Sequence, residues 1–112
     1  MTITGSGNEI RDFTYVEDLV KILSLIINTK KVPNVINSCT GKKTKIILLA
    51  KKIISLTKSK SKIELKSHRN WDKINNRMGS TLRIKKFLNM KKFTNLDHGL
   101  IKTINWYKEQ IN

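Results

Sequence analysis

Apolar residues recur at steps of three and four positions from Val16 to Ile27, and this periodicity constrains the fold more than any other feature of the sequence. Such spacing predicts an amphipathic helix with a broad buried face, which must pack against other elements. Three further helices are expected, with Thr44 and Thr94 as N-terminal caps because their hydroxyls can accept from free backbone N–H groups. The expected helices cover residues 16–27, 44–56, 81–88 and 94–111.

Two short stretches have the character of strands instead. Val35–Cys39 is a short, largely apolar run between a proline and a glycine, and Ile63 and Leu65 alternate with polar residues as in an edge strand. Residues 67–80 show no periodicity and are expected to form a loop, which in compact domains is often functional. The predicted fold is therefore mixed α/β, with about four helices and two or three short strands.

The chain has 112 residues, the size of one domain, and a formal net charge of +15. So basic a chain is expected to be attracted to nucleic acid or another polyanion. However, 19 of its basic residues are lysines and only four are arginines. Lysine is a point charge and lacks the planar fork with which arginine reads bases and phosphates, so a nucleic-acid-binding protein is the second interpretation rather than the first.

The only cysteine, Cys39, excludes an internal disulfide, and with His68 and His98 it shows no metal-ligand spacing. No metal site is expected, and Cys39 is predicted to be a buried, inert thiol. No apolar run reaches the ~18 residues of a membrane span, and the N-terminus does not resemble a signal peptide. A cytoplasmic protein without a membrane segment is expected.

The few arginines stand at informative positions. Gly5-Ser6-Gly7 predicts a turn rather than a dinucleotide fingerprint, because no strand precedes it and no third glycine opens a helix. Arg11 follows this turn, where it could be a surface residue paired with Asp12 or Glu9. Arg69 and Arg77 lie in the aperiodic loop, and a loop that uses arginine among so many lysines suggests bidentate binding of phosphate. Three aromatic residues are expected to be packing residues rather than stacking platforms: Trp71, Trp106 and Tyr107.

Four segments, in order, resemble one family. ITGSGNEIRDFTYVEDLVKIL is similar to the R-D-F turn, strand and V-x-D helix of the extended short-chain dehydrogenase/reductase superfamily, and VINSCTGKKTKIILLAKKI to its N-x-x-x-G strand and following helix. SHRNWDKINNRMGSTLRIKKFLNM resembles its arginine loop and next helix, and TNLDHGLIKTINWYKEQ its closing helix. The resemblance is to NAD-dependent nucleotide-sugar epimerases and dehydratases, for example those like UDP-glucose 4-epimerase.

This resemblance covers only the family's C-terminal part. The G-x-x-G-x-x-G turn that holds NAD and the catalytic Y-x-x-x-K pair have no counterpart, so no cofactor-binding or catalytic residue is expected, and the chain alone should be inactive. NAD is expected only in the complete enzyme. The resemblance implies that Arg11 and Arg69 bind the substrate diphosphate, while Arg77 would fix the loop or the next helix, or support the phosphate.

The sequence thus predicts the substrate-binding C-terminal portion of an extended Rossmann-type epimerase, with residues 1–112 as a single partial domain lacking the N-terminal nucleotide-binding sheet. It would be a gene fragment or half of a split enzyme whose other half is a separate N-terminal Rossmann polypeptide. The alternatives are a small basic nucleic-acid-binding protein and a structural remnant that binds no ligand. The sequence does not choose between sugars, or between epimerase and dehydratase.

Overall fold

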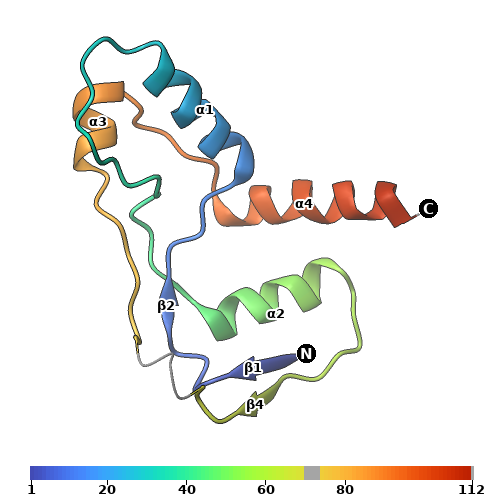
Figure 1. Ribbon diagram of the computed structural model, residues 1–112. Coiled ribbons are helices and arrows are strands. Elements are labelled where there is room, and N and C mark those ends of the chain that lie inside the picture. The colour runs from blue at the N-terminus through green and yellow to red at the C-terminus, as the bar shows by residue number, and fades with distance from the viewer. Residues whose placement is uncertain (70–73, 112) are drawn as a thin grey trace.

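The computed structural model describes residues 1–69 and 74–111. Helical periodicity predicted the helices well, because each of the four expected helices is present and begins within two residues of its expected start. The chain order is shown in Figure 1. The elements are β1 (Thr2–Thr4), β2 (Ile10–Arg11), α1 (Val16–Ile27), β3 (Thr44–Lys45), α2 (Ile46–Leu56), β4 (Glu64–Lys66), α3 (Leu82–Leu88) and α4 (Leu96–Ile111).

The strands form two small sheets. β1 pairs with β4 in parallel, with Ile3 opposite Leu65, which confirms the edge strand predicted around residues 63–65. β2 pairs with β3 in the antiparallel sense, with Arg11 opposite Thr44. Ile10 also forms a bridge to Asn76, so the segment that precedes α3 runs along β2 (Figure 1). β2 is therefore held by β3 and by the end of the predicted loop.

The strand predicted at Val35–Cys39 is wrong, because this segment has no regular structure and belongs to neither of the sheets described here. Side chains satisfy part of its backbone instead. Arg83 Nη1 donates to the carbonyl of Val35 at 2.6 Å, and Thr14 Oγ1 donates to that of Ser38 at 3.4 Å. A strand requires a neighbouring strand to complete its hydrogen bonds, and an apolar run alone does not supply one.

Both predicted threonine caps are also wrong. Thr44 belongs to β3, and α2 begins without a side-chain cap. At the start of α4, the His98 N–H is bound by Asn95 Oδ1 at 2.8 Å, so Asn95 is the capping residue. Thr94 uses both its N–H and its hydroxyl to bind the carboxylate of Asp18, at 2.7 and 3.2 Å. This contact ties the first turn of α1 to the chain entering α4.

The core lies where α1 packs on α3. Ile22 of α1 and Ile84 of α3 are completely buried, and Leu88 and Met90 complete the buried cluster. The broad buried face predicted for α1 is thus only partly present, since a second apolar stripe on this helix faces solvent. We call it the α1 stripe, and it consists of Val16, Leu19, Val20, Leu23 and Ile27.

The chain is thin and open. Its principal extents are 49 × 38 × 19 Å and its radius of gyration is 16.4 Å. A compact chain of this length would have a radius of gyration of about 13 Å. α4 projects from the α1–α3 cluster, and α2 with the β1–β4 sheet forms the opposite side of the molecule (Figure 1). The described residues therefore leave much of the apolar surface uncovered.

Candidate functional site

Arg11 lies at the end of β2 and contacts the predicted arginine loop. Its side chain is half-buried, and Nη1 donates to the carbonyl oxygens of Ile10 at 2.9 Å and Asn75 at 3.2 Å. The backbone of Ile10 binds the same segment twice, since Ile10 N donates to Asn75 O at 2.8 Å and Arg77 N donates to Ile10 O at 3.0 Å. The strand that carries Arg11 therefore lies directly against the segment that carries Arg77.

The beginning of the same loop is held two residues before Arg11. His68 Nε2 lies 3.2 Å from Glu9 Oε1, which also accepts from Ser6 N at 2.9 Å and Ser6 Oγ at 3.0 Å. Arg69 follows His68 directly and is exposed. The structure thus anchors the loop at both ends to Glu9 and Ile10, and the segments carrying all three predicted arginines meet there.

Gly5 makes room for this anchor. It has a φ of +108°, and a Cβ at this position would lie 2.6 Å from Glu9 Oε1 and 2.7 Å from His68 Cε1. Burial of the Glu9 carboxyl would raise its pKa, but hydrogen bonds from the backbone of Glu9, Ser6 and Gly7 and from the Ser6 hydroxyl together hold the pKa below its usual value. Glu9 is therefore a buried carboxylate that stays ionised.

Asp12, next to Arg11, organises the neighbouring turn. Its Oδ1 accepts from Thr40 N at 3.1 Å and from Thr40 Oγ1, and its Oδ2 accepts from Gly41 N at 2.7 Å. Gly41 has a φ of +73°, a conformation that favours glycine. The sequence suggested Asp12 and Glu9 only as partners of Arg11. It did not predict that either carboxylate binds a turn, although the Thr40-Gly41 turn was recognisable in the sequence.

A shallow hollow of about 490 Å³ lies beside this turn and includes Arg77 in its wall. Cys39 also lines it and is buried, as predicted, and burial and the nearby Asp12 raise the pKa of its thiol. Gly79 packs closely against Cys39, because a Cβ on Gly79 would lie 2.5 Å from Cys39 Sγ. The thiol therefore stays protonated at neutral pH and fills space.

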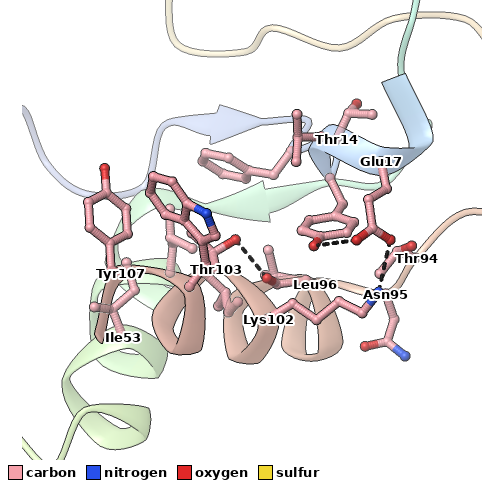
Figure 2. Close-up of a pocket in the computed structure, with 16 residues that line it drawn as sticks. Thr14, Glu17, Ile53, Thr94, Asn95, Leu96, Lys102, Thr103 and Tyr107 are labelled. Atoms are coloured by element: carbon pink, nitrogen blue, oxygen red, sulfur yellow. Dashed lines mark hydrogen bonds and ion pairs between the residues drawn. The ribbon is translucent and has the colours of Figure 1, made fainter. Parts of the chain in front are cut away.

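A larger pocket of about 670 Å³ lies elsewhere, between α4, α2 and the start of α1 (Figure 2). Apolar side chains form much of its wall, and Tyr15, Glu17 and Lys102 form a polar edge. Tyr15 donates to Glu17 Oε1 at 3.1 Å and Lys102 to Glu17 Oε2 at 2.8 Å. Partial burial and the Glu17 hydrogen bond raise the pKa of Tyr15, so its phenol is a poor general base.

Two of the aromatic residues predicted to pack internally lie at this pocket. Trp106 and Tyr107 line it, their rings meet edge to face with centroids 5.1 Å apart, and both remain more than half exposed. Trp71 lies outside the described residues. None of the three arginines lines the pocket that contains Trp106 and Tyr107, so this pocket and the arginine-bearing segments are separate features of the molecule.

The described residues contain neither a metal-binding cluster nor a helix that could span a membrane. Across residues 1–69 and 74–111, no group of three or more His, Cys, Asp or Glu side chains is placed to hold a metal ion. Within the same ranges, none of the helices is both long and apolar enough to cross a bilayer.

Comparison with known proteins shows that this chain is similar to NAD-dependent epimerases and dehydratases. Residues 1–39 match the model of the NAD dependent epimerase/dehydratase family. Among curated proteins, human dTDP-D-glucose 4,6-dehydratase is 30% identical over 122 residues, a match that spans 98% of this chain and 33% of the human protein.

Solved structures of related enzymes superpose on this chain. The epimerase Mth375 from Methanothermobacter thermautotrophicus superposes with a TM-score of 0.94 at 28% identity, over 98% of this chain and 33% of its own. The Bordetella bronchiseptica enzyme WbmF, solved in complex with NAD+ and UDP, superposes with a TM-score of 0.77 at 31% identity, over 96% of this chain and 31% of its own. The chain spans about a third of the length of these relatives.

Proposed function

Because this chain belongs to the NAD-dependent epimerase/dehydratase family of the extended short-chain dehydrogenase/reductase superfamily, we propose that it is the substrate-binding C-terminal portion of a nucleotide-sugar epimerase or dehydratase. Arg11 and Arg69 bind the diphosphate of the substrate, and Arg77 supports the loop between them. Residues 1–112 form a single partial domain, and a cytoplasmic location is part of the proposal.

One observation carries this proposal: both ends of the arginine loop are fixed to the strand segment that ends in Arg11. Asn75 receives a hydrogen bond from the Arg11 guanidinium itself, and His68, the residue before Arg69, contacts Glu9. A diphosphate spread between these segments would meet two planar guanidinium groups, each able to donate to two oxygens. The net charge of +15 adds a favourable field for a substrate with two or more negative charges.

NAD belongs, in this proposal, to the complete enzyme. The Gly5–Gly7 turn does not fit a dinucleotide phosphate, because the Ser6 N–H already donates to the ionised Glu9 carboxylate. A second anion at that N–H would be repelled by the first. No cofactor contact and no catalytic tyrosine–lysine pair is assigned to this chain, which would be inactive alone.

The missing chemistry would come from a separate N-terminal Rossmann polypeptide. The α1 stripe supports this part of the proposal, since Val20 and Ile27 are 60% and 82% exposed on a helix whose opposite face holds the completely buried Ile22. An apolar surface of this kind usually marks an interface. The share of the relatives that the chain spans, about a third, leaves room for such a polypeptide to cover it.

The test is equilibrium binding of UDP-glucose, dTDP-glucose, UDP and uridine to the purified chain. UDP and both sugar nucleotides should bind, and uridine, which lacks the diphosphate, should not. Arg11→Lys and Arg69→Gln should each weaken UDP binding by about tenfold or more, because each removes charge-assisted bonds to phosphate. Arg83→Gln removes an equivalent guanidinium from α3 and is the matched control, expected to leave the affinity unchanged.

The nucleic-acid alternative is tested by adding duplex DNA and RNA to the same binding measurements. Its support is the net charge of +15, and it predicts tight binding of duplex DNA or RNA that weakens steeply with salt. Binding of UDP that is independent of Arg11 and Arg69 would contradict the diphosphate site. Tight nucleic-acid binding together with no UDP binding would replace the proposal with the alternative.

A further inference from the structure

We infer that Glu9 and His68 are positioning residues, which together hold Arg69 beside the Arg11 strand in the form that binds a diphosphate. This inference rests on the proposed function and adds two residues to it. Neither of them would contact the substrate. Their contact joins the turn before β2 to the residues just after β4, and those segments lie far apart in the sequence.

The contact is organised around a buried carboxylate and is not a chance pair of surface residues. Glu9 is only 7% exposed. Its Oε1 accepts hydrogen bonds from both donors of Ser6 and lies 3.2 Å from His68 Nε2. Gly5 leaves its Cα bare beneath both side chains, where a Cβ would overlap each of them. Gly5 and Ser6 are thus arranged around the Glu9 carboxylate that faces the imidazole.

The contact is not needed to hold β1 and β4 together. β1 and β4 are joined by their own ladder from Thr2 to Thr4, and this ladder continues through Gly5 N, which donates to Lys66 O at 2.7 Å. Beyond Lys66, His68 contacts Glu9 at the residue before Arg69. Removing the imidazole would therefore remove this anchor of the chain while leaving the strands paired.

The far end of the loop has its own anchor, so the two ends can be separated experimentally. Asn75 and Arg77 are bound by the backbone of Ile10, and Asn75 also by the Arg11 side chain. These contacts do not involve His68. Loss of the imidazole should consequently affect Arg69 selectively and spare Arg11 and Arg77.

The decisive experiment is a double-mutant cycle with UDP as the probe. His68→Leu removes the donor to Glu9, and it should weaken UDP binding by about five- to tenfold, within the range of couplings measured between contacting residues. The same substitution made in Arg69→Gln should have no further effect, because the residue it positions is already absent. His68→Gln, whose amide can still donate to Glu9, should restore most of the affinity.

Controls distinguish positioning from general damage. His98→Leu removes the other histidine, which lies on α4, and should leave both UDP affinity and melting temperature unchanged. The melting temperature of His68→Leu should also stay close to that of the wild type. If the affinity loss of His68→Leu persists in the Arg69→Gln background, His68 does not act through Arg69 and the inference is wrong.

A second readout needs no ligand. Trypsin should cut after Arg69 several times faster in His68→Leu than in the wild type, with the cut after Arg83 in α3 as the internal reference. Equal rates would overturn the inference whether or not UDP binds. If the wild type binds no UDP while cleavage after Arg69 accelerates, the anchor holds the loop as inferred and the proposed function is what fails.

Discussion

Single side chains in this molecule hold segments that backbone pairing does not reach. Asp12 binds the Thr40–Gly41 turn, Asp18 binds Thr94, and Glu9 binds Ser6 and contacts His68. Each carboxylate accepts from at least one backbone N–H in a region without a sheet ladder. Three of the eight acidic residues of this very basic chain are thus used as acceptors that fix loops.

Glu9 should make the fold sensitive to acid. The folded chain holds the pKa of Glu9 below its ordinary value of 4.5, so the ionised carboxylate favours folding. This contribution is complete above the unfolded pKa and is lost as the pH falls through the lower folded pKa. Glu9→Gln should therefore flatten the loss of stability between pH 6 and about pH 3, as measured by urea unfolding.

Ser6→Ala, which removes one donor to the Glu9 carboxylate, should show an intermediate slope. An acid slope in Glu9→Gln equal to that of the wild type would contradict this assignment.

Gly79 should not tolerate a methyl group. Alanine there would place Cβ 2.5 Å from Cys39 Sγ and 2.8 Å from Cys39 Cβ, so one backbone must move. Gly79→Ala is expected to lower the free energy of unfolding by ~1–3 kcal/mol, the usual cost of overpacking. Cys39→Gly, which removes both atoms, should recover part of that loss in the double variant, as measured by chemical denaturation. Purely additive effects would show that the two residues are not in contact.

Helix α1 has two apolar faces with different roles. Ile22 is completely buried against α3, whereas Val20, two positions away, is 60% exposed. Ile22→Ala should destabilise the chain by ~2–5 kcal/mol, because it leaves a cavity in a small core. Val20→Ala on the same helix should cost far less, and the melting temperatures of the two variants give the comparison. Equal losses would mean that the α1 stripe is covered in solution.

The elements also show which features a sequence can predict. The helices followed from local spacing of apolar residues, and α1 was placed at its observed bounds. The strand expected at Val35–Cys39 failed because a strand depends on a partner, and Arg83 and Thr14 bind part of this backbone instead. β1 was not anticipated, because three residues carry little pattern and their partner is distant in the sequence.

The candidate site also has some features that the sequence could predict and others that it could not. Arg11, Arg69 and Arg77 stood out because arginine is scarce in this chain, and their role in binding a diphosphate stays a prediction. The contact of Glu9 with His68 could not be predicted, because no local pattern links two residues so far apart in the chain. The two glycines Gly5 and Gly41 gave a partial indication of the carboxylate contacts, because glycine is common in turns. Both have a positive φ, and they lie beside the carboxylates of Glu9 and Asp12 respectively.

The open form of the chain has a physical cost. Its radius of gyration of 16.4 Å exceeds the ~13 Å of a compact chain of this length. The α1 stripe and the pocket beside Trp106 both leave apolar side chains in contact with water. Such surfaces favour association, with a partner when it is present and with other copies when it is absent.

Polar substitutions in the α1 stripe should therefore reduce self-association. The double variant Val20→Glu with Ile27→Lys keeps the net charge and interrupts the stripe at its middle and its end. It should sediment as a monomer at concentrations where the wild type forms larger species, with little change in melting temperature. Leu65→Lys, at an exposed position of β4 outside the stripe, is the control. Unchanged association of the double variant would place the contact elsewhere.

The parallel pairing of β1 with β4 has a consequence during synthesis. At about 5–20 residues per second, the ribosome makes Thr2 roughly 3 to 12 s before its partner Glu64. In that interval α1 and α2 can already form from local contacts, while β1 has no neighbouring strand and the apolar faces of the helices are exposed to solvent. The yield of this protein in a cell should then depend on the chaperones that reach it before β4 emerges, more than on the melting temperature of the finished fold.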